Sequence, residues 1–529
     1  MNKFRTLSVY IECSTNSTPT VETLKKYIDI ISKMGYNELY LGCTDAYKIE
    51  GEPYFNYKRG GYTTEDFQEI DAYAKTKGIE VLASIQTLAH LHFLQRHDCY
   101  RDIMDTDHIL MVGEERVYEL VDRMFASISK GLSSRRIHIG YDEAYGLGTG
   151  AYYKKHGYAD KKELLLTHLK RVVEIADKYG YTCEVWADML METDQTKVTA
   201  DDVKKLLPAH TRAVMWKYQE CREEVLSGLL KDLKAHADNV AFAGSVWKCA
   251  GFGPNMAFSN HVTLKQMEAC EKEGVDQYIV TLWSDAGAWC SIWSVLTSLF
   301  LYSEYAKGNY VEGGEIDKEK FYQITGMRYD DMYSFQYLND PFKKEVQVLG
   351  NRSYWILMSD ILLCNYDLIL SKGTGEAYKK LSAEYKKVDG KYCAHVFEMA
   401  SAISYILGIK SELGVTLRYA YNENDREMLQ TCIKDLQALQ RRMKKFIDIY
   451  TRYFTTDNMA YGVEVNHLFL GGQIARYSYI EKAVKAYLTE GKKIEELETE
   501  TLMPSLIPQP GEDKCLQFNY RWLLTYCWL

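Results

Sequence analysis

Proline is scarce in this chain, which has 8 prolines among 529 residues, and no low-complexity tract interrupts it. Hydrophobic residues make up 47% of the sequence, a content that disfavours disorder. A chain of this length and composition buries one large core and a second one, so we expect two domains.

The sequence also lacks an excess of positive charge. Its formal net charge is -9, and no run of lysine or arginine reverses that charge locally. Because such a chain repels phosphate backbones and anionic lipid surfaces, we expect no nucleic-acid partner and no membrane partner.

Leader segments and ordered cysteine patterns are missing as well. The opening segment MNKFRTLSVYIECSTNS lacks the continuous apolar stretch of a signal peptide, and no window approaches the roughly 20 apolar residues of a membrane span. The 13 cysteines show neither CxxC pairs nor regular spacing. These absences favour reduced thiols in a cytoplasmic protein.

The chain does have a regular alternation of strand-like and helix-like segments. Apolar runs such as TLSVYIE, NELYLGC and IEVLASIQ alternate with amphipathic stretches such as VETLKKYIDIISKMG. The later strand-like runs are RRIHIGYDE, TCEVWADM, RAVMWKY, NVAFAGSVW and QYIVTLWSD. Eight such units in about 300 residues predict an α/β fold, a (β/α)8 TIM barrel, over residues 1–308.

From residue 309 onward the strand-like runs disappear and long helical stretches follow, which predict an α-helical C-terminal domain over residues 309–529. Charged segments such as KDLQALQRRMKKF lie in these helices. Two interpretations of that charge stay open: a solvated face, and a surface for a second copy of the chain in a homo-oligomer.

The expected strand ends are rich in acids and aromatics, and these are the positions where TIM barrels collect catalytic groups. The fourth strand ends in the adjacent acids Asp142 and Glu143. Side chains alternate along a strand, so Asp142 should face the barrel interior, and a bend at the loop would turn Glu143 over the same cavity from another side. Two neighbouring acids then reach one substrate from two directions.

Tryptophans at four strand ends indicate the kind of substrate. They are Trp186, Trp216, Trp247 and Trp283. A flat aromatic face suits the C–H face of a pyranose ring, so a sugar is the expected guest. A glycosidase needs a carboxylic acid to protonate the leaving oxygen, and an adjacent carboxylate in an apolar pocket raises the pKa of that acid.

The segment HIGYDE resembles the H-I-G-x-D-E signature of family 20 glycoside hydrolases, the β-N-acetylhexosaminidases, and is most similar to the hexosaminidase D branch. Supporting segments lie in order along the chain: QTLAHLHF, VWADML, VMWKY, GPNMAFSNHV and TLWSD. The resemblance covers roughly residues 6–300.

The resemblance implies an exo-acting enzyme that removes terminal β-linked GlcNAc or GalNAc from a glycan or glycoconjugate with retention. In this family the substrate's own acetamido oxygen attacks the anomeric carbon and forms an oxazolinium intermediate. By position, Glu143 matches the general acid/base, and Asp142 matches the carboxylate that holds the acetamido N–H.

Further residues are implied in substrate binding by the same resemblance: Trp186, Trp216, Tyr218, Trp247, Trp283, Asp285, His90 and Asp45. Asp285 stands where the family usually has a glutamate that binds ring hydroxyls, and Tyr218 is the candidate for polarising the acetamido carbonyl. The arginine common on the first strand is absent, so Asp45 is expected to take over hydroxyl contacts.

Two rival functions are weighed against this one. A metal-dependent TIM-barrel hydrolase or isomerase would place carboxylates and histidines at strand ends, but the HLH segment of residues 90–92 lacks the other ligands. A non-catalytic N-acetylhexosamine-binding barrel has no use for two costly adjacent carboxylates. We therefore expect a glycosidase with no metal and no cofactor.

Overall fold

The computed structural model describes residues 2–502 except 192, 194–195, 207–210, 250, 346–349, 351 and 364–365, and beyond these 506–507 and 515–516. The chain divides into two compact units. The first comprises Met1–Ser245, Asn260–Trp283 and Leu299–Ile316. The second comprises Val246–Ser259, Ser284–Ser298 and Asp317–Leu529.

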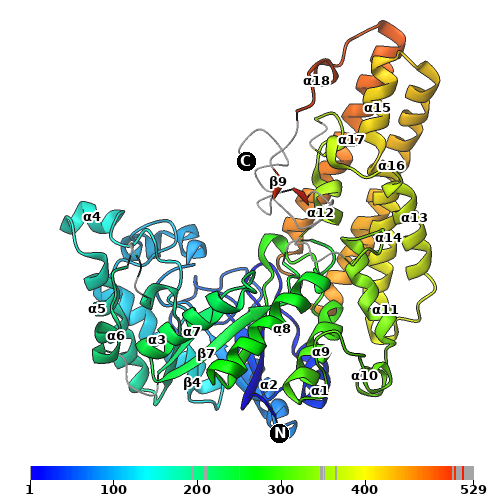
Figure 1. Ribbon diagram of the computed structural model, residues 1–529. Coiled ribbons are helices and arrows are strands. Elements are labelled where there is room, and N and C mark those ends of the chain that lie inside the picture. The colour runs from blue at the N-terminus through cyan, green and yellow to red at the C-terminus, as the bar shows by residue number, and fades with distance from the viewer. Residues whose placement is uncertain are drawn as a thin grey trace. The chain divides into compact units, whose positions relative to one another are not determined.

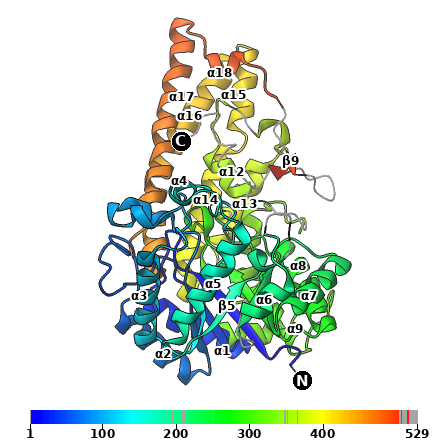
Figure 2. The same ribbon diagram turned by 90° about the vertical axis from the view of Figure 1, so that its left-hand side faces the viewer.

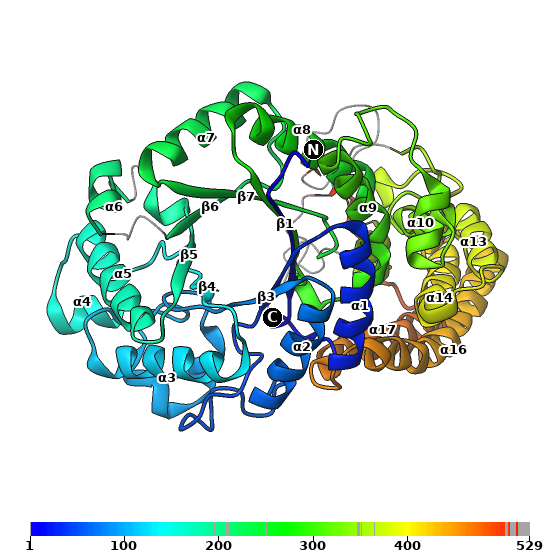
Figure 3. The same cartoon turned by 90° about the horizontal axis from the view of Figure 1, so that it is seen from below.

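Eight parallel strands form a closed barrel in chain order, and the last strand pairs with the first, as Figure 3 shows from one end. The strands are β1 Thr6–Glu12, β2 Glu38–Gly42, β3 Glu80–Ser84, β4 Arg136–His138, β5 Thr182–Trp186, β6 Arg212–Trp216, β7 Asn239–Ser245 and β8 Gln277–Leu282. The predicted (β/α)8 barrel is therefore confirmed.

Helices alternate with the strands and surround the barrel (Figure 3). They are α1 Val21–Met34, α2 Thr64–Thr76, α3 Glu115–Gly131, α4 Ala151–His156, α5 Lys161–Asp177, α6 Ala200–Leu206, α7 Glu223–His236, α8 Met256–Glu273 and α9 Leu296–Ala306. Local sequence fixes their ends: a capping box between Thr63 and Asp66 starts α2. Gly35 adopts a left-handed φ of 99° and ends α1.

Charged side chains occupy the interior of the barrel near the beginnings of the strands. Glu184 is buried on β5, where it accepts hydrogen bonds from Tyr40 Oη at 2.6 Å and from Arg136 Nε at 3.0 Å. Arg212 Nη1 lies 3.0 Å from the same carboxylate, and Arg136 Nη1 lies 2.6 Å from Glu38. These residues neutralise one another at the strand beginnings, opposite the end where the expected site lies.

Aromatic and aliphatic side chains fill the barrel above this ion network. The cluster comprises Tyr10, Tyr40, Leu82, Trp186, Val214, Ala241, Ala243 and Ile279, with Trp216 and Trp283 packed against it. Since Trp186 and Trp216 stand at the ends of their strands, the core continues without a break into the expected site.

The second unit is helical, as predicted for the C-terminal region. Its helices are α10 Lys318–Thr325, α11 Tyr329–Tyr333, α12 Arg352–Met358, α13 Thr374–Tyr385, α14 Ala394–Lys410, α15 Leu413–Asn422, α16 Arg426–Asp457, α17 Val463–Glu490 and α18 Glu495–Glu498. The longest two, α16 and α17, lie side by side (Figures 1 and 2). The short strands β9 Leu506–Ile507 and β10 Cys515–Leu516 form an antiparallel pair.

One apolar stretch of this unit, Lys391–Asn422, is long and apolar enough to cross a membrane by length and composition, which is weak evidence because core helices of soluble proteins pass the same test. Its most apolar window is 61% buried. Helix α14 lies in this stretch against α13 and α16. The buried Lys410 at its end donates to the carbonyl oxygen of Ser359 at 2.7 Å. Burial lowers the pKa of Lys410 to about 7.

The domain boundary that the sequence predicts at residue 308 stays a prediction. The two segments that follow β7 and β8, Val246–Ser259 and Ser284–Ser298, group with the helices of the second unit. Within that unit, Asn339 Nδ2 donates to the carbonyl oxygen of Gly253 at 2.8 Å, and Tyr453 Oη donates to that of Trp289 at 3.0 Å.

Candidate active site

The strand that carries the acid pair is shorter than the sequence suggests. β4 ends at His138, and the backbone then turns, with positive φ values of 71° at Gly140, 83° at Tyr141 and 54° at Glu143. Such values are uncommon for residues other than glycine and cost about 1–3 kcal/mol each, and they cluster at functional sites. A Cβ at Gly140 would meet Gln86 Oε1 at 2.0 Å, so glycine is required here.

Two contacts hold this turn in place. The Gly140 N–H donates to His138 Nδ1 at 3.1 Å, and burial lowers the pKa of His138 to about 4, so its ring is neutral and accepts the bond. Tyr141 packs outward against α5, where its hydroxyl donates to the carbonyl oxygen of Leu165. These two contacts fix the backbone turn that carries both acids.

His90 faces both acids. Its Nε2 lies 3.2 Å from Asp142 Oδ2 and 3.6 Å from Glu143 Oε2. Gln86 Nε2 donates to the other Asp142 oxygen at 3.4 Å. The predicted pair and the predicted histidine are thus brought together by the ends of β3 and β4.

The surroundings of the two acids shift their pKa values in opposite directions. Burial and the Asp142 charge both raise the pKa of Glu143. Burial acts to raise the pKa of Asp142, but the charge and hydrogen bond of His90, together with a backbone hydrogen bond and His138, outweigh burial and lower it. The contact between His90 and Asp142 raises the pKa of His90 to about 9, against the effect of its burial. The pKa values of the two neighbouring acids are thus shifted in opposite directions, that of Glu143 toward the protonated form and that of Asp142 toward the carboxylate.

A third carboxyl belongs to this group. Asp188, the first residue of a short 3-10 helix Asp188–Leu190, accepts hydrogen bonds from the Glu143 backbone N–H at 3.0 Å and from Trp216 Nε1 at 3.3 Å. Burial and the Asp142 charge raise the pKa of Asp188 to about 7. From the sequence alone, a role in the site and a salt bridge to a neighbouring loop are equally open for Asp188. Its position two residues after Trp186, at a strand end, is the signal that points to it.

Aromatic rings stand around the acids. Trp283 lies with its ring centroid 4.9 Å from Tyr10 and 6.1 Å from Trp186. Tyr218 stacks on Trp216 at 5.3 Å and meets Trp283 edge-on at 6.2 Å. The indole N–H groups of Trp186 and Trp283 are buried and have no hydrogen-bond partner among the described residues. An aromatic wall of this kind suits a ligand that has C–H faces.

Three further predicted site residues come from the loops after β2, β7 and β8. Asp45 is buried in the loop after β2, where Arg59 Nε lies 2.9 Å from its carboxylate. Trp247 and Asp285 belong to the second unit. There the Trp247 backbone N–H donates to Ser259 Oγ at 2.9 Å, and Asp285 begins the 3-10 helix Asp285–Gly287. Their expected roles in substrate binding stay predictions.

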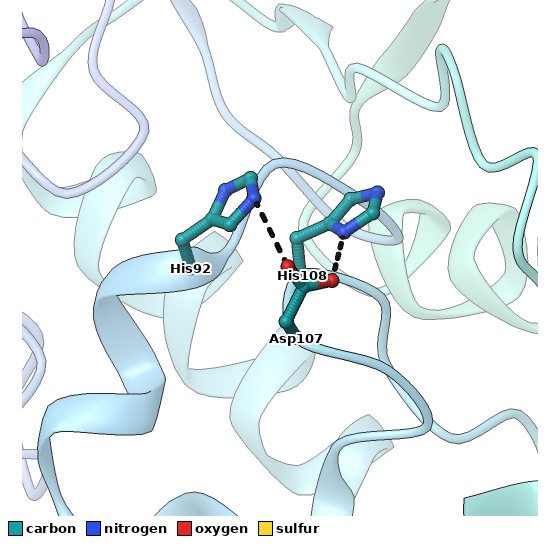
Figure 4. Close-up of side chains that lie close together, drawn as sticks. All are labelled: His92, Asp107 and His108. Atoms are coloured by element: carbon teal, nitrogen blue, oxygen red, sulfur yellow. Dashed lines mark hydrogen bonds and ion pairs between the residues drawn. The ribbon is translucent and has the colours of Figure 1, made fainter. Parts of the chain in front are cut away.

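Within the described ranges, one group of side chains has the composition and spacing to hold a metal ion. It consists of His92, Asp107 and His108, whose ligand atoms all lie within 4.8 Å of one another (Figure 4). This group does not include the acid pair.

Comparison with known proteins agrees with the resemblance over the barrel and adds a match over the helical region, which the resemblance does not cover. Residues 16–235 match the glycosyl hydrolase family 20 catalytic domain, and residues 330–513 match the glycoside hydrolase 20C C-terminal domain. The first range includes the acid pair, His90, Trp186, Trp216 and Tyr218.

Individual relatives are more distant. Hexosaminidase D of Homo sapiens is 24% identical over 209 residues, which cover 38% of this chain and 42% of the human protein. Hexosaminidase D of Bos taurus is also 24% identical over 209 residues, covering 38% of this chain and 59% of the bovine protein. The chain thus spans about half the length of these relatives.

Among solved structures, the GH20 exo β-N-acetylglucosaminidase from Vibrio harveyi in complex with N-acetylglucosamine is similar, with a TM-score of 0.47 and 15% identity over 64% of this chain and 59% of that one. Taken together, the two matched domains and the hexosaminidase D relatives establish that the chain belongs to glycoside hydrolase family 20, with a catalytic domain followed by a 20C-type C-terminal domain.

Proposed function

We propose that this protein is an exo-acting β-N-acetylhexosaminidase that removes terminal β-linked N-acetylhexosamine from a glycan or glycoconjugate, with retention of configuration and with the substrate's acetamido group as the nucleophile. The observation that carries the proposal is the split of the acid pair: Glu143 has a raised pKa and Asp142 a lowered one. Neighbouring acids driven apart in this way are suited to separate roles in one reaction.

In the first step, the acetamido oxygen attacks the anomeric carbon while the bond from that carbon to the leaving oxygen breaks. Glu143 gives its proton to the leaving oxygen, so the aglycone departs as a neutral alcohol. Asp142 accepts a hydrogen bond from the acetamido N–H, and its negative charge stabilises the positive oxazolinium ring.

In the second step, a water molecule attacks the anomeric carbon and opens the oxazolinium. The Glu143 carboxylate takes a proton from this water, which restores the acid for the next cycle. Two displacements at one carbon return the sugar with its original configuration.

The surrounding side chains position the sugar for these steps. Trp216 and Trp283, which are partly exposed, offer flat faces for the pyranose ring and the acetamido methyl group, and Tyr218 stands beside both. The buried Trp186 packs against Trp283 and supports this wall. His90 holds Asp142 in its ionised form through the 3.2 Å contact. The acids are adjacent in sequence because the leaving oxygen and the acetamido group, on which they act, occupy neighbouring carbons of one ring.

The test is hydrolysis of matched nitrophenyl β-glycosides of GlcNAc, GalNAc and glucose, each with and without a thiazoline analogue of the oxazolinium and a chelator. We expect turnover of one or both N-acetyl sugars, no turnover of the glucoside, inhibition by the thiazoline and no effect of the chelator. Hydrolysis of the glucoside at a comparable rate, or loss of turnover with the chelator, would overturn the proposal.

A further inference from the structure

Two neighbouring histidines of the loop after β3, His90 and His92, turn to different surroundings. His90 has a left-handed φ of 60° and directs its ring to the acid pair. His92 begins the 3-10 helix His92–Arg96 and faces Asp107 and His108, from a later part of the same loop (Figure 4). The second histidine is therefore not used by the proposed reaction.

The three side chains of this group lie close together. His92 Nε2 is 3.9 Å from Asp107 Oδ2, and His108 Nδ1 is 2.6 Å from Asp107 Oδ1. The two imidazole rings are stacked, with centroids 4.7 Å apart and planes 12° from parallel. Figure 4 shows the carboxylate between the two rings.

The backbone that carries these side chains is fixed by hydrogen bonds. The Leu91 N–H donates to the carbonyl oxygen of His108 at 3.1 Å, and the Leu110 N–H donates to that of Leu88 at 2.9 Å. These bonds tie the segment before His92 to the segment that holds Asp107 and His108. The ligand set is thus held together by the backbone and does not depend on side-chain contacts alone.

We propose that His92, Asp107 and His108 form a binding site for a divalent transition metal, with Zn²⁺ as the best match, on the β3–α3 loop outside the acid pair. Two imidazoles and one carboxylate are a ligand set that Zn²⁺ accepts, with a water molecule in the remaining position. Hard cations such as Mg²⁺ prefer ligand sets built from oxygen atoms alone, so we do not expect them to bind to these two imidazoles.

Only a small rearrangement is needed to bind the ion. Ligand atoms about 2.1 Å from a tetrahedral Zn²⁺ lie roughly 3.4 Å from one another. The present ligand atoms lie within 4.8 Å of one another, and the His92 and Asp107 side chains are 62% and 68% exposed. Rotation of these exposed side chains closes the site without displacing buried groups, and the ion enters directly from solvent.

The site is close to the catalytic group but separate from it. The His108 ring centroid lies 6.5 Å from that of His90, which remains engaged with Asp142. The metal therefore has no place in the proposed hydrolysis, and its binding is measured without reference to activity.

The experiment is titration of the metal-free, full-length protein with Zn²⁺ in the presence of a competing chromophoric chelator. We expect one Zn²⁺ bound per chain through this site. His92→Ala and His108→Ala should each bind Zn²⁺ at least about 10-fold more weakly. Loss of a residue that only supports a metal ligand already costs about that much affinity, and these variants lose a ligand itself. Mg²⁺ at the same concentration should not compete.

A matched control is His156→Ala. His156 is an exposed histidine whose Nε2 lies 3.3 Å from Glu114. It does not belong to the group of His92, Asp107 and His108 that forms the proposed site. This variant should bind Zn²⁺ as the parent does. The proposal is overturned if no Zn²⁺ binds at one equivalent, or if the double variant His92→Ala/His108→Ala keeps the parent's affinity while its thermal unfolding is unchanged.

Discussion

The backbone N–H of Glu143 donates a hydrogen bond to Asp188 Oδ2 at 3.0 Å. The other oxygen of Asp188 accepts the indole N–H of Trp216. One carboxyl thus fixes both the backbone of the proposed proton donor, which has a left-handed φ of 54°, and a wall of the sugar site. Asp188 is a positioning residue that acts through its two partners.

The first prediction concerns the pH dependence of stability in Asp188→Asn. Because the folded-state pKa of Asp188 is raised to about 7, the folded protein retains a proton that the unfolded chain loses near pH 4. The parent therefore loses stability as the pH rises from about 4 through 7, and the asparagine variant escapes this loss.

From pH 5 to pH 8, the free energy of unfolding of Asp188→Asn minus that of the parent should rise by about 1–3 kcal/mol. Denaturant unfolding at the two pH values measures this gain, with Asp102→Asn, which changes an exposed aspartate, as the control. An identical pH dependence in parent and variant would contradict the assignment.

The second prediction concerns Glu143→Gln, which removes the proton donor and keeps its shape. Substrates with poor leaving groups should lose about 10²–10⁴-fold in kcat/KM, whereas dinitrophenyl glycosides, which leave without a proton, should lose far less. The measurement is kcat/KM across a leaving-group series. Glu119→Gln, on the exposed face of α3, should behave as the parent. An equal loss on all leaving groups would rule out the acid role.

The third prediction concerns Asp142→Asn. The Asp142 charge raises the pKa of Glu143, and His90 acts more weakly in the opposite direction. Removal of the Asp142 charge therefore lowers the pKa of Glu143, and the alkaline limb of the pH profile of the residual kcat/KM should move to lower pH. The thiazoline should also bind more weakly, because the carboxylate that faces its positive ring is gone. An unmoved alkaline limb would show that Asp142 does not control the acid.

The sequence predicts the barrel because alternation of apolar strands with amphipathic helices extends through all eight units. It overestimates the strands at their C-terminal ends: RRIHIGYDE is expected as one strand, but β4 stops at His138. Side-chain alternation applies to extended backbone, and the left-handed residues Tyr141 and Glu143 are not extended. The error therefore falls where the strands give way to the site.

The contacts made by the loops also cannot be predicted from the pattern of residues. The HLH segment gives no sign that His90 and His92 separate, or that Asp107 and His108 return to His92. Likewise, Asp45 is expected beside ring hydroxyls, but the structure pairs it with Arg59, 14 residues further along the chain. Such pairings depend on loop paths, for which hydrophobic periodicity carries no information.

The last prediction concerns the ion network at the barrel base. Glu184 is 1% exposed and faces both Arg136 and Arg212, so Glu184→Gln leaves the buried Arg212 and the partly buried Arg136 with one carboxylate fewer. Breaking a buried pair in this way typically costs about 3–5 kcal/mol.

We expect a loss of that size in the free energy of unfolding, measured by denaturant titration. Asp98→Asn is the control, because it breaks a pair with Arg101 whose side chains are 89% and 78% exposed and should cost less than about 1 kcal/mol. Equal stabilities for the two variants would mean that the barrel base does not depend on this charge. A loss confined to Glu184→Gln would show that a buried ion network, and not apolar packing alone, stabilises the end of the barrel opposite the acids.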